Sequence, residues 1–267
     1  MKKHLLIIFC IAVSLPLLSQ KKFVSNGSFY LSWGYNTEWY GKSDIHVVQP
    51  GMNCDYTFRN IEAHDHIGWD KLFQRALTIP QYNYRIGYFF DEKQDLGIEI
   101  NFDHTKYIVT QGQTVKVSGT LNGRSVDSTL TITDDVLNYQ LNNGANFLLF
   151  NIVKKINIYT TPAGAINICG LGKFGVGPLI PHVQNKIFGN LNEPHFQIGG
   201  WNTGIEAGIK VTVEKYHVYL EFCNKLDYAR YSQLKVYQGN VDQSFFCYEL
   251  ILNLGYYFRT GKLTVAN

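Results

Sequence analysis

The sequence predicts an all-β fold: an eight-stranded antiparallel up-and-down transmembrane β-barrel with long extracellular loops. Segment 246–258 has large apolar side chains at every second position, which indicates a strand with one continuous apolar face. Aromatic residues occupy both ends of that face and leucines its middle, as in a lipid-facing strand between two interfacial girdles. The composition is rich in Tyr, Phe and Gly and poor in Met and Pro, which favours β-structure throughout.

The N-terminus has the pattern of a secretory signal peptide. Lys2 and Lys3 precede an apolar run at 5–18, and we expect cleavage after Ser19, so that the signal peptide covers residues 1–19. No later stretch approaches the roughly eighteen consecutive apolar residues of a spanning helix. Any insertion into a membrane would therefore use strands.

Alternation and turn residues divide the rest of the chain into eight strands. We expect them at 28–40, 82–90, 96–103, 145–159, 165–177, 196–213, 217–228 and 244–258. Their connections alternate between long and short, so the first, third, fifth and seventh, which are long, would share one rim. Residues 20–258 would form the barrel, and residues 259–267 a C-terminal periplasmic tail.

The first two long connections contain structural patterns of their own. Segment 41–81 has two short alternating pieces and a predicted helical turn at 69–75, so we interpret it as a surface loop with its own hairpin. If residues 44–63 instead add a pair of strands to the wall, the barrel has ten strands. In the second long connection, Asn122-Gly123 favours a type I′ turn and therefore a hairpin.

The last strand resembles the C-terminal assembly signal of bacterial outer-membrane β-barrels. The match consists of a terminal aromatic residue preceded by alternating apolar residues, namely Tyr248, Leu250, Leu252, Leu254, Tyr256 and Phe258. It departs from the signal because residues 259–267 follow. The resemblance implies a location in the outer membrane, assembly by the barrel-assembly machinery, and contact with outer-membrane lipid and lipopolysaccharide.

The alternation also assigns a set of polar residues to the lumen. These are Arg85, Glu99, Asn101, Asp103, Glu206, Lys210, Glu221, Lys225, Asp227, Glu249 and Asn253. An eight-stranded barrel is narrow and is normally filled by side chains. Because buried charges must be paired, and the set contains acids and bases, we expect a packed salt-bridge plug. A path for protons or solutes is the alternative.

Histidines and carboxylates cluster in the segments that would meet at the extracellular rim. A catalytic site would use His104 or His64 as a base, with Asp103 or Asp65 as the orienting acid. A metal site would use imidazole ligands, for which the candidates are His46, His64 and His66. The alternative is ordinary rim structure without chemistry.

Three further features have structural interpretations. Four cysteines follow the signal peptide, and no two of them form a CxxC pair: Cys54, Cys169, Cys223 and Cys247. We expect free buried thiols, with a disulfide or a zinc site as alternatives. Segment 170–175 matches G-x-G-x-x-G, the pattern of dinucleotide-binding loops, but glycine and Pro178 follow it instead of a helix. We therefore interpret it as a glycine-rich strand, and we expect no cofactor. The tryptophans fit an interfacial belt, or alternatively a carbohydrate-binding stripe.

The sequence does not specify an activity. The leading hypothesis is a structural, adhesive or surface-binding protein whose extracellular loops bind a ligand. The second is a lipid-modifying acyl hydrolase or transferase, by analogy with the lipid A deacylases and palmitoyltransferases among small outer-membrane barrels. The third is a narrow, porin-like channel for small solutes. Nucleic acid is not an expected partner, because acidic and basic residues nearly balance.

Overall fold

The computed structural model describes residues 21–66, 81–90, 95–141, 144–192 and 196–265. The predicted signal peptide at 1–19 and the predicted helical turn at 69–75 lie outside these ranges. Among the described residues, no helix has the length and apolar character needed to cross a membrane.

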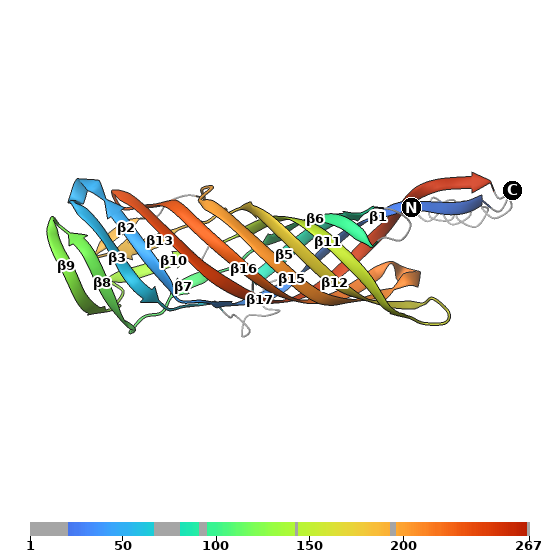
Figure 1. Cartoon of the computed structure of the whole chain (residues 1–267), viewed down its shortest axis with the longest axis horizontal. Coiled ribbons are helices and arrows are strands. Elements are labelled where there is room, and N and C mark those ends of the chain that lie inside the picture. The colour runs from blue at the N-terminus through green and yellow to red at the C-terminus, as the bar shows by residue number, and fades with distance from the viewer. Residues whose placement is uncertain (1–20, 67–80, 91–94, 142–143, 193–195, 266–267) are drawn as a thin grey trace, which may run out of the picture.

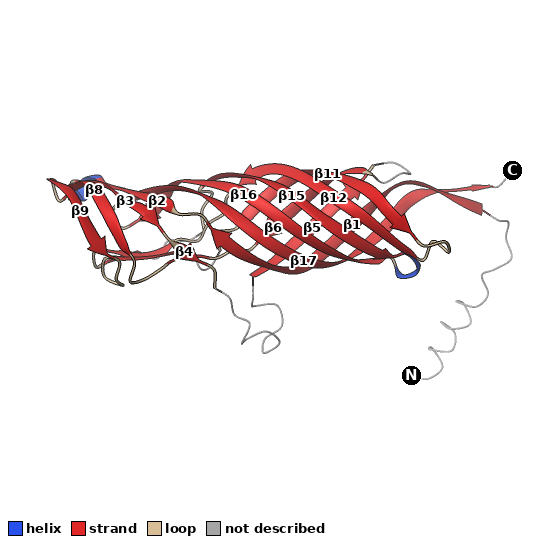
Figure 2. Cartoon of the chain, turned by 60° about the horizontal axis from the view of Figure 1, so that its bottom comes forward, coloured by secondary structure: helices blue, strands red, loops and turns tan. Residues whose placement is uncertain are grey.

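Eight antiparallel strands form a closed ring (Figures 1 and 2). They are β1 (Lys21–Tyr40), β5 (Gln81–Phe89), β6 (Leu96–Asp103), β11 (Phe147–Thr160), β12 (Ile166–Pro178), β15 (Gly200–Val213), β16 (Val218–Val236) and β17 (Gly239–Val265). The ring closes because β1 pairs with β5 on one side and with β17 on the other. The predicted eight-stranded antiparallel barrel is therefore confirmed.

The connections place the two ends of the barrel on opposite sides of a membrane. The connection 161–165 and the short helix η3 (Glu214–Tyr216) lie at the end where the described chain begins in β1 and ends in β17, and the strand ends that flank the β5–β6 connection lie there too (Figure 1). The longer connections all lie at the other end. Outer-membrane barrels keep their short turns and termini in the periplasm, so the end with the long connections is extracellular.

The outer surface of the ring has an apolar band between two aromatic levels. Leu252, in the middle of β17, is 54% exposed, and its cross-strand neighbour Phe222 is 49% exposed. Trp39 and Tyr248 lie 5.6 Å apart at the extracellular level, and Phe29 and Tyr88 lie 4.6 Å apart at the periplasmic level. This is the arrangement expected of a lipid-facing wall with two interfacial girdles.

The wall continues beyond the ring on the extracellular side. There β2 (Ser43–Gln49) replaces β1 as the neighbour of β17, and β3 (Cys54–Ile61), β8 (Thr114–Leu121) and β9 (Arg124–Thr131) follow in the same sheet. The helix η1 (Pro50–Met52) joins β2 to β3. Because β1 and β17 already close the ring, β2 and β3 do not enter it, and the ten-stranded alternative is wrong.

A second sheet faces this extension. Its order is β14 (Asn190–Asn192), β13 (Gln184–Ile187), β10 (Leu137–Leu141), β7 (Tyr107–Val109) and β4 (Ala63–His64). The predicted hairpin turn is present between β8 and β9, where Asn122 and Gly123 have positive φ angles of 51° and 75°. Both central residues of a type I′ turn need positive φ, so the prediction from the Asn-Gly pair is confirmed.

Two segments that were predicted to lie outside the strands, the loop at 229–243 and the tail at 259–267, belong largely to strands in the structure. The expected loop at 229–243 is instead the upper part of a long hairpin, in which β16 and β17 continue and pair up to Val236 and Gly239. Most of its inward side chains are apolar and belong to the extracellular core, which favours strand over loop. The expected tail is also partly strand, because β17 runs to Val265 and its last residues pair with Lys21–Ser25 of β1.

Candidate functional site

The lower part of the barrel interior contains a dense polar network. All eleven residues that alternation assigned to the lumen are at most 6% exposed, so that assignment is confirmed. They belong to β5, β6, β15, β16 and β17, whose inward side chains meet at the barrel axis. This network and the extracellular half above it both contain residues with candidate functional roles.

One centre of the network surrounds Arg85. Its guanidinium Nη1 lies 2.8 Å from both carboxylate oxygens of Glu206 and 3.4 Å from Glu99. Lys173 binds the same group of acids, with its Nζ 2.6 Å from Glu221, 3.0 Å from Glu99 and 3.1 Å from Glu206. Each cation thus contacts several carboxylates, which is what burial of these charges requires.

A second centre lies nearer the extracellular side and surrounds Lys225. Its Nζ lies 2.5 Å from Asp103, 3.1 Å from Asp227 and 3.2 Å from Glu249. Together with the Arg85 centre, it fills the axis with ion pairs whose side chains are at most 2% exposed. The predicted packed plug is therefore confirmed for the described part of the lumen.

Two charged members of the network, Lys173 and Glu38, were not assigned to the lumen from the sequence. Lys173 lies in the glycine-rich stretch of β12, where the glycines obscure the alternation that marks it as an inward-facing residue. Glu38, at the upper end of β1, accepts hydrogen bonds from Asn36 and Gln81. Glu38 follows Asn36 by two residues, so continuing the alternation of β1 by one more step would have found it.

Above the polar network, the extracellular half has a hydrophobic core. It combines aliphatic and aromatic side chains, and Phe245 of β17 stacks on Tyr107 of β7 with ring centres 4.8 Å apart. Tyr107 also lies 6.3 Å from Tyr139 of β10, so both sheets contribute to the same core. The described parts of the long connections are therefore mostly β-structure around a core, which gives this part of the extracellular half a defined shape (Figure 2).

The sheet of this half ends in an exposed strand. β9 pairs with β8 on one side, and within the described residues no strand pairs with its other side. Val126 and Leu130 face the core, while Ser125, Asp127 and Thr129 on the opposite face are exposed. Figure 1 places this hairpin at the end of the molecule farthest from the termini. Such an edge presents unpaired backbone N–H and C=O groups to the surroundings.

The structure separates the two predicted catalytic groups of the third strand. Asp103 faces the lumen and binds Lys225. His104 faces the other way, with its Nδ1 2.8 Å from the side-chain oxygen of Asn146 and its ring stacked on Tyr82 at 4.6 Å. Burial lowers the pKa of His104. Neighbouring residues of an extended chain point in opposite directions, so Asp103 does not orient His104 as a base.

The predicted residues of the first loop also have separate partners. His64 lies 3.1 Å from the hydroxyl of Thr110, whereas Asp65 is buried at the barrel rim and accepts a hydrogen bond from the backbone of Glu38. Burial raises the pKa of Asp65. His46 pairs with Asp55 at 2.8 Å in an exposed position between β2 and β3.

The three histidines proposed as metal ligands do not converge within the described ranges. The cluster that does have ligand spacing there is Glu206, Glu221 and Cys223. Its two glutamates already bind Arg85 and Lys173, so their charge is compensated without a metal. Metal binding by His46, His64 and His66 stays a prediction, and the structure does not bring the three side chains together.

The four cysteines that were predicted to be free are free buried thiols: Cys54, Cys169, Cys223 and Cys247.

Comparison with known proteins finds likeness only at the level of structure. No family model matches the chain, and no curated protein matches it in sequence. The outer membrane protein OprG from Pseudomonas aeruginosa has 13% identity and a TM-score of 0.42, with 89% of this chain and 98% of OprG covered. Ail, the attachment invasion locus protein of Yersinia pestis, has 13% identity and a TM-score of 0.32, with 87% and 99% covered.

A third similar structure is the outer membrane protein AlkL, with 9% identity and a TM-score of 0.37 over 94% of this chain and 99% of AlkL. The class of the present chain follows from its own geometry. It has a closed antiparallel ring of eight strands, an apolar outer band with aromatic girdles, and short turns at the end that carries the termini. The chain is a small outer-membrane β-barrel protein of the eight-stranded type.

Proposed function

We propose that the protein is a surface-binding protein that presents its extracellular β-extension, and above all the β8–β9 hairpin, to a partner outside the cell. The observation that carries the proposal is the ordered hydrophobic core of the extracellular half. A barrel that only anchors itself in the membrane needs no core above the bilayer. A core holds loops and strand edges in fixed positions, which lowers the entropy lost when they bind a partner.

The exposed edge of β9 supports a specific mode of recognition. A strand with one unpaired edge can accept an extended segment of a partner as an additional strand, with main-chain hydrogen bonds providing affinity. The outward residues Ser125, Asp127 and Thr129 would then contact the partner's side chains. The Asp127 carboxylate is held by Lys116 of β8 at 2.8 Å, so this face is already ordered before binding.

The filled lumen favours this proposal over the channel. Arg85, Lys173 and Lys225 occupy the axis with their carboxylate partners, and the hydrophobic core of the extracellular half lies above them. The lipid-modifying alternative has no such support, because Asp103 and His104 lie on opposite faces. Planar-bilayer recordings should therefore show no steady conductance, and lipid A profiles should be the same in deletion and overexpressing strains.

The decisive experiment places charge on the outward face of β9. Cells that display the parent protein are compared with cells that display a Ser125→Lys/Thr129→Lys variant for binding to arrays of immobilised extracellular-matrix proteins and glycans. We expect binding by the parent and its loss in the variant, because added lysines block edge pairing. Thr160→Lys is the matched control, since Thr160 is exposed at the periplasmic end.

Equal display of the three proteins is verified by heat-modifiability on gels. If the parent binds no array component, or if the β9 variant and the Thr160 control bind equally well, the proposed role of the hairpin is wrong. A steady ion current through the parent protein would instead support the channel.

A further inference from the structure

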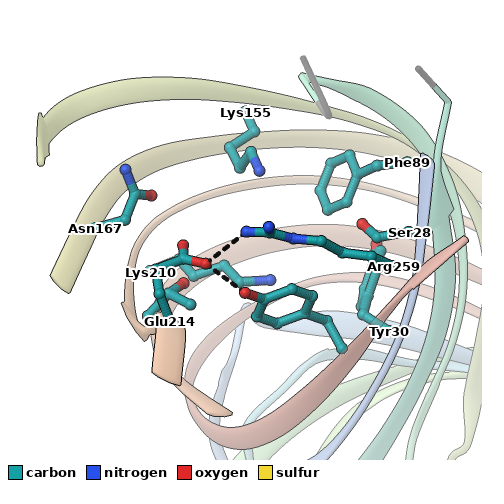
Figure 3. Close-up of a pocket in the computed structure, with 10 residues that line it drawn as sticks. Ser28, Tyr30, Phe89, Lys155, Asn167, Lys210, Glu214 and Arg259 are labelled. Atoms are coloured by element: carbon teal, nitrogen blue, oxygen red, sulfur yellow. Dashed lines mark hydrogen bonds and ion pairs between the residues drawn. The ribbon is translucent and has the colours of Figure 1, made fainter. Parts of the chain in front are cut away.

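We propose that the periplasmic mouth of the barrel is a binding site for a carboxylate group, separate from the extracellular surface discussed above. A cavity of about 30 Å³ opens there inside the ring, and six of its lining residues carry the argument: Lys155, Lys210, Thr212, Glu214, Tyr257 and Arg259. They come from β11, β15, η3 and β17, so strands distant in sequence build this periplasmic pocket together. Figure 3 shows the side chains of Lys155, Lys210, Glu214 and Arg259 pointing toward this pocket.

Positive charge predominates in the periplasmic pocket. Lys155, Lys210 and Arg259 face it, against a single carboxylate, Glu214. That carboxylate already has partners, because it accepts hydrogen bonds from the Tyr257 hydroxyl and from Arg259 Nη2, the latter at 2.8 Å. Glu214 therefore compensates Arg259 and leaves the two lysines without an opposite charge in the pocket.

Lys210 is the most informative of these groups. Its side chain is buried, with 6% of the residue exposed, yet among the described residues it forms no ion pair. Its Nζ lies 3.4 Å from the centre of the Tyr219 ring and 5.0 Å from that of Tyr30. The ring faces offset part of the lost hydration, but an ammonium group carries three donors, and aromatic faces do not replace an anionic acceptor.

Lys155, on β11, two strands from β15 in the ring, has the same character. Its Nζ lies 4.8 Å from the centre of the Phe89 ring, and in the described structure it has no carboxylate partner. The other lysines of the lumen differ, since Lys173 and Lys225 each contact three carboxylates. Two unpaired ammonium groups beside an arginine are the donor set that an oxyanion requires.

The size of the cavity selects the anion. About 30 Å³ corresponds to roughly two water-sized positions, which matches the two oxygens of a carboxylate better than the four of a phosphate. The pocket ends against the polar network, where the Tyr30 hydroxyl donates to Glu99 at 2.9 Å. A ligand must therefore enter from the periplasm and does not pass through the barrel.

The test uses the refolded full-length mature barrel in detergent micelles with ¹³Cε-labelled lysines. Sodium acetate is titrated at constant ionic strength against chloride, and the Cε resonances of Lys155 and Lys210 are followed. We expect both to shift with one saturable curve. Lys210→Met should weaken acetate binding at least about tenfold, because it removes a charge-assisted hydrogen bond. Lys154→Met is the matched control, since Lys154 faces outward and pairs with Asp95.

Two further arms identify the ligand and its source. Inorganic phosphate should bind more weakly than acetate. A short peptide with a free C-terminal carboxylate is compared with its C-terminal amide: binding of acetate and the acid peptide assigns the site to carboxylates at polymer ends, and binding of acetate alone assigns it to free solutes. Lys155→Met is titrated as a second variant in case Lys210→Met fails to refold.

Several results would overturn the proposal. These are no saturable shift with acetate, stronger binding of phosphate than of acetate, equal binding of the peptide amide, or acetate binding that is unchanged in the lysine variants that fold.

Discussion

Replacing Arg85 by methionine tests whether the lumen is a dry, packed plug. Arg85 is fully buried, and its Nη1 lies 2.8 Å from both oxygens of Glu206. Arg85→Met keeps much of the side-chain volume but leaves Glu206 and Glu99 with Lys173 as their remaining nearby cation. Removing one partner of a buried ion pair costs about 3–5 kcal/mol, a large part of a typical stability of about 5–15 kcal/mol.

The assay is urea unfolding in phospholipid vesicles, followed by tryptophan fluorescence. Arg59→Met is the matched control, because Arg59 forms an ion pair of 2.7 Å with Asp44 while both side chains are nearly half exposed. An exposed pair contributes about 0–1 kcal/mol. Adding Glu206→Gln to Arg85→Met should recover part of the loss by removing excess negative charge. If Arg85→Met costs no more than Arg59→Met, water fills the lumen and the reasoning about the plug fails.

Three other predictions test the wall and the rim. Leu252→Arg, on the lipid-facing side of β17, should cost about 2–4 kcal/mol of unfolding free energy in vesicles, and an unchanged midpoint would contradict the outward assignment. Gly87→Ala should cost about 1–3 kcal/mol, because a Cβ there would lie 2.2 Å from the Tyr30 ring, whereas Gly172→Ala, with open space around it, should have little effect in the same assay. Burial lowers the pKa of His104 below its ordinary 6.5, so the unfolded chain binds a proton first as the pH falls. Urea midpoints should therefore decrease from about pH 7.5 to about pH 5.5, and less so in His104→Gln; equal slopes would refute this.

The sequence predicted those parts of the fold in which alternating apolar and polar side chains can be assigned to only one face each, the outer and the inner face of the barrel. In the membrane, every outward residue of β17 must be apolar, so Leu252 and Leu254 mark the outer face and Glu249 and Asn253 the inner face. The same rule placed Arg85 and Lys225 in the lumen. The partners of each charge could not be predicted, because they depend on the stagger between strands, and this is set by pairing around the whole ring.

The extracellular half could not be predicted in the same way. Its strands are short, and several pair with segments far away in the sequence, as β3 does with β8. Local pattern identified the hairpin at Asn122-Gly123, where the turn itself carries the signal. It did not reveal that His64 and His104 have different partners, because the proximity of rim residues depends on how the loops fold onto the core.

The inner face of β17 explains why the extracellular parts of β16 and β17 were predicted to be a loop. Its inward residues change from Asn253 and Glu249 in the membrane to Phe245 and Val241 above it, although the parity stays the same. Within the bilayer, lipid covers the apolar outer face, and the narrow interior can hold paired charges. Above the bilayer, water covers the outer face, so the apolar side chains turn inward and form a core. The change between Glu249 and Cys247 coincides with the aromatic Tyr248 on the outside, and this coincidence places the extracellular surface of the membrane at that level of the barrel.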